Sequence, residues 1–132
     1  MVKITSLIVL LFLSVFASGD YLTDYKSGLQ KAKSEHKLVA VTIVQTYCPW
    51  CAKFKKETLV DKNVSQMLRQ NFVYIVLNRD TQDIPQQFRT RLVPTTFFVN
   101  TNSEKILETA TGYVDAEEFM DYLNEAVKKS KK

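Results

Sequence analysis

Two kinds of apolar pattern alternate along most of the chain. Apolar side chains at helical spacing predict helices over residues 21–36, 49–57, 61–71 and 115–129, and a short helix over residues 83–89. Apolar runs rich in branched and aromatic residues predict strands over residues 38–44, 72–77, 95–99 and 105–111. This mixture of element types is typical of an α/β protein.

The order of these elements predicts how the strands pair. Residues 38–44 are almost wholly apolar, which is typical of a central strand covered on both faces. A helical stretch separates them from the strand at 72–77, so we expect these two strands to be parallel. Residues 100–103 form a turn-rich tetrapeptide, which predicts an antiparallel hairpin of the last two strands. We therefore expect an α/β sandwich with a mixed four-stranded sheet and helices on both faces.

The N-terminal residues follow a different pattern. Lys3 precedes a mostly apolar run over residues 4–17, and small or polar residues follow. This order is typical of a secretory signal peptide, and the run is shorter than the roughly 20 apolar residues that a transmembrane helix needs. We expect a signal peptide over residues 1–19 and one domain over residues 20–132, in a periplasmic or secreted protein. An uncleaved N-terminal anchor is the alternative.

Composition and charge limit the kinds of partner that the protein can have. The 132 residues carry a formal charge of +4, and much of the surplus lies in residues 128–132. A basic end after a helix is usually solvated. Because no basic patch with interleaved aromatic residues occurs, we expect no nucleic-acid partner. The length remaining after the first nineteen residues suits one domain with a single core, which we expect to be a monomer.

The two cysteines carry the candidate chemistry. Cys48 and Cys51, the only cysteines in the chain, form a C-x-x-C motif directly after a predicted strand. A disulfide across so short a ring constrains the unfolded chain little, so stability is a poor reason for the pair. The carboxyl end of a strand is where open α/β sheets place their active sites. The motif therefore predicts a redox-active pair.

The start of a helix makes the first cysteine reactive. At the N-cap, unpaired backbone N–H groups stabilise the Cys48 thiolate and lower the pKa of its thiol. Cys48 is then expected to attack a partner disulfide, and Cys51, one turn further on, to resolve the mixed disulfide. Pro49 restricts the backbone between them. Trp50 offers a flat apolar surface, either for a partner to lie on or to cover the start of the helix.

Other interpretations of the C-x-x-C motif have less support. A C-x-x-C pair is half of a zinc site, but the single histidine, His36, precedes the strand and no further ligand is evident. We therefore expect neither a metal nor a cofactor. A non-catalytic peptide-binding module with an inert disulfide does not need two cysteines at a helix start. A glutaredoxin-like enzyme is the nearest catalytic alternative, and export away from cytosolic glutathione weakens it.

Four features in chain order resemble the thioredoxin superfamily. They are Tyr47 to Cys51 after a strand, Leu77-Asn78-Arg79-Asp80 at a strand end, Val93-Pro94-Thr95 opening a strand, and Gly112 before the last helix. The resemblance covers essentially the whole chain after the first nineteen residues and implies the thioredoxin-like fold. It also implies that Pro94 is cis and lies against the cysteines, and that the Val93 backbone pairs with a partner strand.

Two further segments are similar to a particular branch of this superfamily. Residues 57–64 and 111–119 resemble the periplasmic C-terminal thioredoxin-like domain of bacterial transmembrane thiol-disulfide reductases. This resemblance implies a protein-disulfide reductase whose partners are disulfide-containing or dithiol proteins, including a membrane or soluble redox partner. A proline after the first cysteine is common in more oxidising relatives, and in this feature the chain resembles them. A disulfide-forming oxidant is therefore the alternative.

The chain departs from the thioredoxin pattern beneath the cysteines. Thr42 and Val76 occupy the places where thioredoxins bury a carboxylate and a lysine. Loss of both leaves an apolar site, whereas loss of one would leave an unpaired buried charge. Three candidates for the proton acceptor of Cys51 follow from this departure: water, Thr42 and a group of the partner. Three lysines follow the motif and either steer acidic partners, favour the thiolate or form a solvated helix face: Lys53, Lys55 and Lys56.

Overall fold

The computed structural model describes residues 21–132; the predicted signal peptide lies outside the described residues. The regular elements are α1 (Tyr25–Glu35), β1 (Leu38–Val44), α2 (Pro49–Lys53), the π-helical segment η1 (Phe54–Thr58), α3 (Lys62–Asn71), β2 (Phe72–Asn78), the 3₁₀ segment η2 (Gln86–Phe88), β3 (Thr95–Val99), β4 (Ile106–Thr111) and α4 (Ala116–Ser130). Within residues 21–132, none of the helices combines the length and apolar character needed to span a bilayer.

The four strands form one mixed sheet in the order β2-β1-β3-β4. Strands β1 and β2 are parallel, and Thr42 of β1 lies opposite Val76 of β2. Strand β3 is antiparallel to both β1 and β4. The predicted sheet, with its apolar central strand and its C-terminal hairpin, is confirmed.

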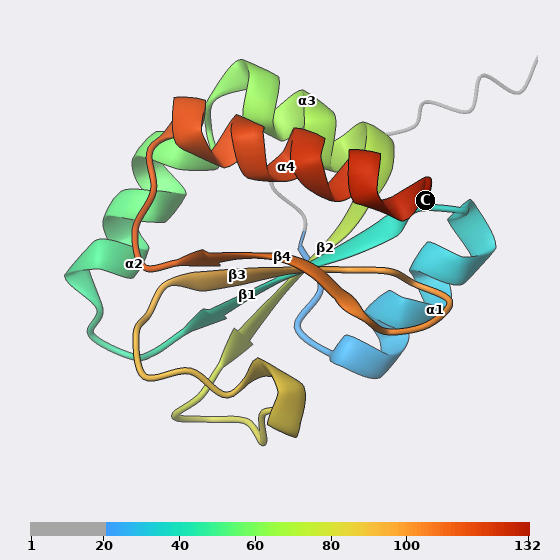
Figure 1. Cartoon of the computed structure of the whole chain (residues 1–132). Helices are drawn as coiled ribbons and strands as arrows, with labels where there is room; N and C mark the ends of the chain where they lie inside the picture. Colours follow the sequence, from blue (N-terminus) through green and yellow to red (C-terminus); the bar gives the residue numbers. More distant parts are fainter. Residues whose placement is uncertain (1–20) are drawn as a thin grey trace, which may run out of the picture.

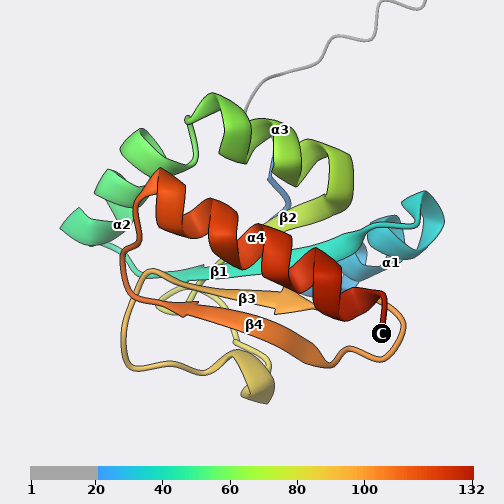
Figure 2. The same ribbon diagram turned by 45° about the horizontal axis from the view of Figure 1, so that its top comes forward.

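Helices cover both faces of the sheet (Figure 1). On one face, η1, α3 and α4 enclose a hydrophobic core that includes Phe54, Phe98 and Phe119. On the other face, α1 and η2 enclose a second core that includes Ala32 and Phe88. Figure 2 shows α3 and α4 side by side above the sheet, with α4 over β3 and β4. Strand β1 is buried along its middle five residues because both cores use it.

Aspartates set the starts of three helices. The side chains of Asp24, Asp61 and Asp115 accept hydrogen bonds from backbone N–H groups in the first turns of α1, α3 and α4. These bonds satisfy donors that have no partner inside the helix. A cysteine rather than an aspartate, Cys48, takes the same place at the start of α2.

The structure corrects two predicted helices. Residues 21–23 do not belong to the first helix, because Asp24 caps it and Leu22 pairs with β2, hydrogen-bonding Tyr74 and Val76. The helix predicted over residues 83–89 is only the short segment η2. Pro85 has a non-helical ψ of 139° and no N–H donor, so no longer helix forms there.

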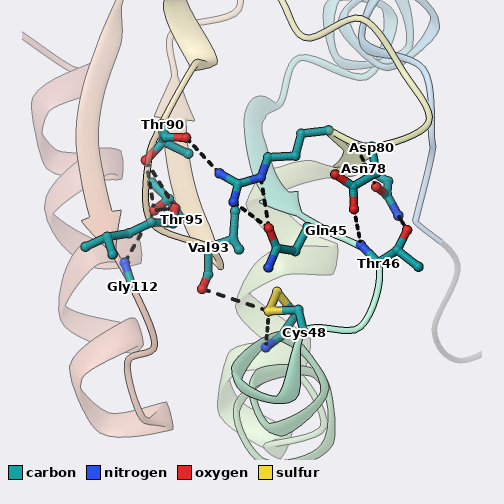
Figure 3. Close-up of a disulfide and its surroundings, with 12 residues drawn as sticks. Gln45, Thr46, Cys48, Asn78, Asp80, Thr90, Val93, Thr95 and Gly112 are labelled. Atoms are coloured by element: carbon teal, nitrogen blue, oxygen red, sulfur yellow. Dashed lines mark hydrogen bonds between the residues drawn. A yellow bond between two sulfur atoms is a disulfide. The ribbon is translucent and has the colours of Figure 1, made fainter.

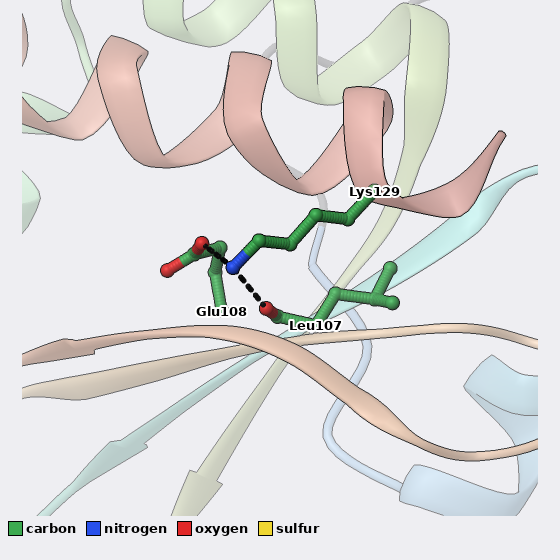
Figure 4. A network of polar contacts seen from close by, with 3 residues as sticks. All are labelled: Leu107, Glu108 and Lys129. Atoms are coloured by element: carbon green, nitrogen blue, oxygen red, sulfur yellow. Dashed lines mark hydrogen bonds and ion pairs between the residues drawn. The ribbon is translucent and has the colours of Figure 1, made fainter. Parts of the chain in front are cut away.

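The end of α4 is attached to the edge of the sheet. The Lys129 ammonium pairs with the Glu108 carboxylate and donates a hydrogen bond to the Leu107 carbonyl at 3.4 Å (Figure 4). The hydrogen bond to Glu108 raises the pKa of Lys129. This pair is exposed, so its contribution to stability is small.

Candidate active site

The cysteine pair lies at the carboxyl end of β1. Cys48 and Cys51 form a disulfide, and Cys48 is the N-cap residue of α2, as the sequence predicts. The backbone N–H of Cys51 donates a hydrogen bond to Sγ of Cys48 at 3.1 Å. A donor in this position stabilises a thiolate on Cys48 more than a thiol. In the disulfide form both cysteines are half-buried.

The loop before β3 reaches the disulfide. The Val93–Pro94 peptide bond is cis, and Pro94 is buried. The Val93 carbonyl oxygen lies 4.0 Å from Sγ of Cys48, as Figure 3 shows. This is a contact rather than a hydrogen bond, because a disulfide sulfur carries no hydrogen. The fold therefore brings together the Cys48, Val93 and Pro94 that the sequence predicts for the site.

Trp50 packs on an aromatic residue from the other end of the chain. Its ring centroid is 5.6 Å from that of Tyr113, and the Lys53 ammonium lies over both rings, 5.2 Å from the centroid of Trp50 and 4.8 Å from that of Tyr113. Lys53 is thus engaged in cation–π contacts at the helix surface. Trp50 nevertheless remains 57% exposed, which leaves part of its ring free for a partner.

Two hydrogen bonds fix the helical segment after the cysteines. The Tyr113 hydroxyl donates to the Glu57 carboxylate at 3.0 Å, and the buried Thr58 hydroxyl donates to the Val114 carbonyl at 2.7 Å. Burial, followed by the bond to Glu57, raises the pKa of Tyr113. Sequence reasoning did not assign Tyr113 to the site, because no local pattern connects it with Trp50.

Exposed apolar side chains gather around the disulfide. Tyr47 is 96% exposed and has a positive φ of 54°, which turns the chain sharply just before Cys48. Leu92, next to Val93 in the loop before β3, is 59% exposed. Together with Trp50 these residues form what we call the apolar rim, consisting of Tyr47, Trp50 and Leu92. Exposed apolar groups concentrated at one place are typical of a surface that binds a partner.

Thr42, at the place of the thioredoxin carboxylate, bonds to two other hydroxyl groups. The Tyr74 hydroxyl donates to Oγ1 of Thr42 at 2.7 Å, and the hydroxyls of Thr42 and Thr96 share a second bond of 2.7 Å. Burial raises the pKa of Tyr74, so this group stays neutral. The Thr42 oxygen thus accepts one bond and shares another, and both of its partners are neutral hydroxyl groups.

The end of β2 supports the loop that leads to Cys48. A carboxylate oxygen of Asp80 accepts a hydrogen bond from the Thr46 backbone N–H at 2.9 Å. The Asn78 side chain donates to the Thr46 hydroxyl at 3.3 Å. Figure 3 shows these residues beside Cys48. Among residues 21–132, no group of three His, Cys, Asp or Glu side chains is placed to hold a metal ion.

The comparison with protein families identifies the class. Residues 25–127 match the model of a family described as a thioredoxin-like domain, so the chain belongs to this family. Its C-x-x-C pair, joined as a disulfide at the start of α2, is the candidate redox site of this thioredoxin-like domain. The chain is also 27% identical, over 97 residues, to the thiol:disulfide interchange protein DsbD of Actinobacillus pleuropneumoniae. That match covers 70% of this chain and only 17% of DsbD.

Solved structures show the same fold. A thioredoxin from Thermus thermophilus superposes with a TM-score of 0.75 at 23% identity, over 83% of this chain and 88% of that one. The oxidised C-terminal domain of DsbD from Neisseria meningitidis has a TM-score of 0.66 at 18% identity, over 81% of this chain and 99% of that domain. The expected similarity to a reductase C-terminal domain is confirmed at the level of family and fold.

Proposed function

We propose that the protein is an exported reductase of protein disulfides. The observation that carries the proposal is the meeting of two loops: Sγ of Cys48, at the start of α2, lies 4.0 Å from the Val93 carbonyl beside cis-Pro94. A nucleophile beside a free backbone segment suits a partner that is a polypeptide. The proposed catalytic residues are Cys48 and Cys51.

The reaction proceeds in two exchange steps. The Cys48 thiolate attacks one sulfur of the partner disulfide, the partner's S–S bond breaks, and the released partner thiolate takes up a proton. The Cys51 thiol loses its proton and its sulfur attacks Sγ of Cys48, which releases the second partner thiolate. Two electrons pass from the Cys48–Cys51 dithiol to the partner. A dithiol protein then reduces the Cys48–Cys51 disulfide again.

The surface around the disulfide supports a polypeptide partner. The Val93 backbone offers hydrogen-bonding groups to an extended strand, and cis-Pro94 fixes the direction of the chain at this point. The apolar rim adds three exposed side chains against which the partner's side chains pack. In this proposal Trp50, Val93 and Pro94 bind the substrate, while Tyr47, Pro49 and Thr42 form the surroundings of the cysteines.

The first test of the proposal concerns the direction of electron flow. Neither Pro49 nor Trp50 has a positively charged side chain that would stabilise a thiolate on Cys48, so the thiolate relies mainly on the start of α2. We expect a moderately oxidising disulfide, found mainly oxidised in glutathione buffers poised at about −180 to −210 mV. Thiol trapping after equilibration measures the redox state. A pair that stays reduced in these buffers is an oxidant, contrary to the proposal.

A second experiment tests whether the protein is exported and loses its signal peptide. The apolar run over residues 4–17 and the small residues after it support removal of a signal peptide. When the gene is expressed with its own N-terminus, we expect the exported protein to begin between residues 18 and 20. Intact-mass measurement on the secreted or periplasmic fraction gives the start. A mass that includes residues 1–16 would instead support an N-terminal membrane anchor.

A further inference from the structure

Arg79 connects the two loops that meet at the disulfide. Its Nε and Nη2 atoms both donate hydrogen bonds to Oε1 of Gln45, in the loop that leads to Cys48. Its Nη1 atom donates to the carbonyl oxygens of Thr90, at 3.0 Å, and Arg91, at 3.2 Å. One half-buried guanidinium group at the end of β2 therefore holds a side chain of one loop and the backbone of the other.

The second loop is fixed at both of its ends. We call residues 90–94 the docking loop, because they end in the cis-Val93–Pro94 bond. Beyond the bonds from Arg79, the Leu92 carbonyl accepts hydrogen bonds from the hydroxyls of Thr90, at 3.1 Å, and Thr95, at 2.7 Å. Figure 3 shows Val93 and Gln45 between Thr90 and Cys48. The Arg79 guanidinium is the group that joins the docking loop to Gln45 in the loop that leads to Cys48.

The loop that carries the cysteines has other attachments. Its Thr46 residue is held by Asp80 and Asn78, and the Arg79 backbone N–H donates to the Val44 carbonyl at 3.0 Å. None of these bonds involves the Arg79 guanidinium. Removing the guanidinium should therefore displace the docking loop more than it displaces Cys48.

We propose that Arg79 is a positioning residue that fixes the docking loop relative to Cys48 and thereby favours polypeptide disulfides over small ones. This inference rests on the proposed function. A small disulfide needs access only to the Cys48 sulfur. A polypeptide must pair with the Val93 backbone and present its own sulfur to Cys48 at the same time, so the spacing of the two loops matters.

The geometry requires an arginine. A guanidinium is a planar fork that serves several acceptors on two sides, whereas a lysine ammonium is a single compact donor. Arg79→Lys keeps the positive charge but cannot reach Gln45 and the two carbonyl groups together. The same exchange at the exposed Arg89, just before the docking loop, is the matched control because Arg89 lies outside the proposed contacts.

The experiment compares two substrates of different size. The reduced wild-type protein, Arg79→Lys and Arg89→Lys each react with the disulfides of insulin and with 5,5′-dithiobis(2-nitrobenzoate), a small disulfide. For Arg79→Lys we expect the second-order rate constant with insulin to fall by about tenfold or more, and that with the small disulfide to change by less than about twofold. The reduction potential of the cysteine pair should be unchanged, and Arg89→Lys should match the wild type.

The outcomes separate this inference from the proposed function. If Arg79→Lys lowers the rate constants with both substrates equally, or lowers neither, the positioning role of Arg79 is overturned. The proposed function would then still be supported by the activity of the wild type. A wild-type protein that reacts with the small disulfide but not with insulin would overturn both proposals. If circular dichroism shows that Arg79→Lys is unfolded, Gln45→Ala provides the same comparison, because it removes the acceptor of two guanidinium bonds.

Discussion

Cys48→Ser is expected to abolish disulfide exchange, whereas Cys51→Ser is expected to trap partners as stable mixed disulfides. The difference follows from position, because Cys48 caps α2 and receives the Cys51 N–H at its sulfur. A serine hydroxyl is not a nucleophile at neutral pH, so the rate with protein disulfides should fall by several orders of magnitude. Non-reducing gel electrophoresis followed by mass spectrometry identifies the trapped species.

Limiting alkylation provides an independent check of the same assignment. In the reduced protein near neutral pH, iodoacetamide should modify Cys48 before Cys51, because the more acidic thiol supplies more thiolate. The rate of modification should follow the ionisation of Cys48 as the pH is raised. Mixed disulfides formed by Cys48→Ser, or earlier labelling of Cys51, would reverse the two roles.

Thr42→Asp is expected to destabilise the protein by about 3–5 kcal/mol at neutral pH, because it places an unpaired carboxylate in a buried position. Thr42 is 1% exposed, and its partners Tyr74 and Thr96 are neutral hydroxyls. Burial raises the carboxyl pKa in the folded state above its value of about 3.9 in the unfolded chain. Urea unfolding at a series of pH values measures the effect.

The free energy of unfolding of Thr42→Asp should fall as the pH rises. Below about pH 4 the carboxyl is protonated in both states, so the penalty is smallest there. As the pH rises towards the higher folded-state pKa, only the unfolded chain loses the proton, and the free energy of unfolding falls. The matched control, Thr42→Asn, has a similar size and no charge, so its penalty should not change with pH.

A second substitution tests whether the buried charge causes the loss. Val76 lies opposite Thr42 in the parallel pairing of β1 and β2, so Val76→Lys places an ammonium on the neighbouring strand. The double variant with Thr42→Asp should recover part of the stability at neutral pH. If Thr42→Asp and Thr42→Asn were equally stable at every pH, the carboxylate would be solvated and this account would be wrong.

The sheet and the place of the cysteines could be predicted from the sequence alone. The apolar run over residues 38–44 predicted a central strand, and β1 is buried along its middle five residues. The turn-rich residues 100–103 predicted the hairpin of β3 and β4. The C-x-x-C motif predicted a helix start with Cys48 as its N-cap. Each of these features depends on residues that are close together in the sequence, so a local sequence pattern predicts it.

The side chains that surround the cysteines are set by contacts between distant parts of the chain. Gln45 meets Arg79 across 34 residues, and Tyr113 meets Glu57 across 56. The pairing of Leu22 with β2 likewise removed residues 21–23 from the helix predicted over residues 21–36. Such contacts have no period along the chain, because they depend on how the sheet brings separate loops to one edge. The place of Cys48 is thus fixed by local sequence, whereas the surface that we propose for a partner is fixed by packing between residues far apart in the chain.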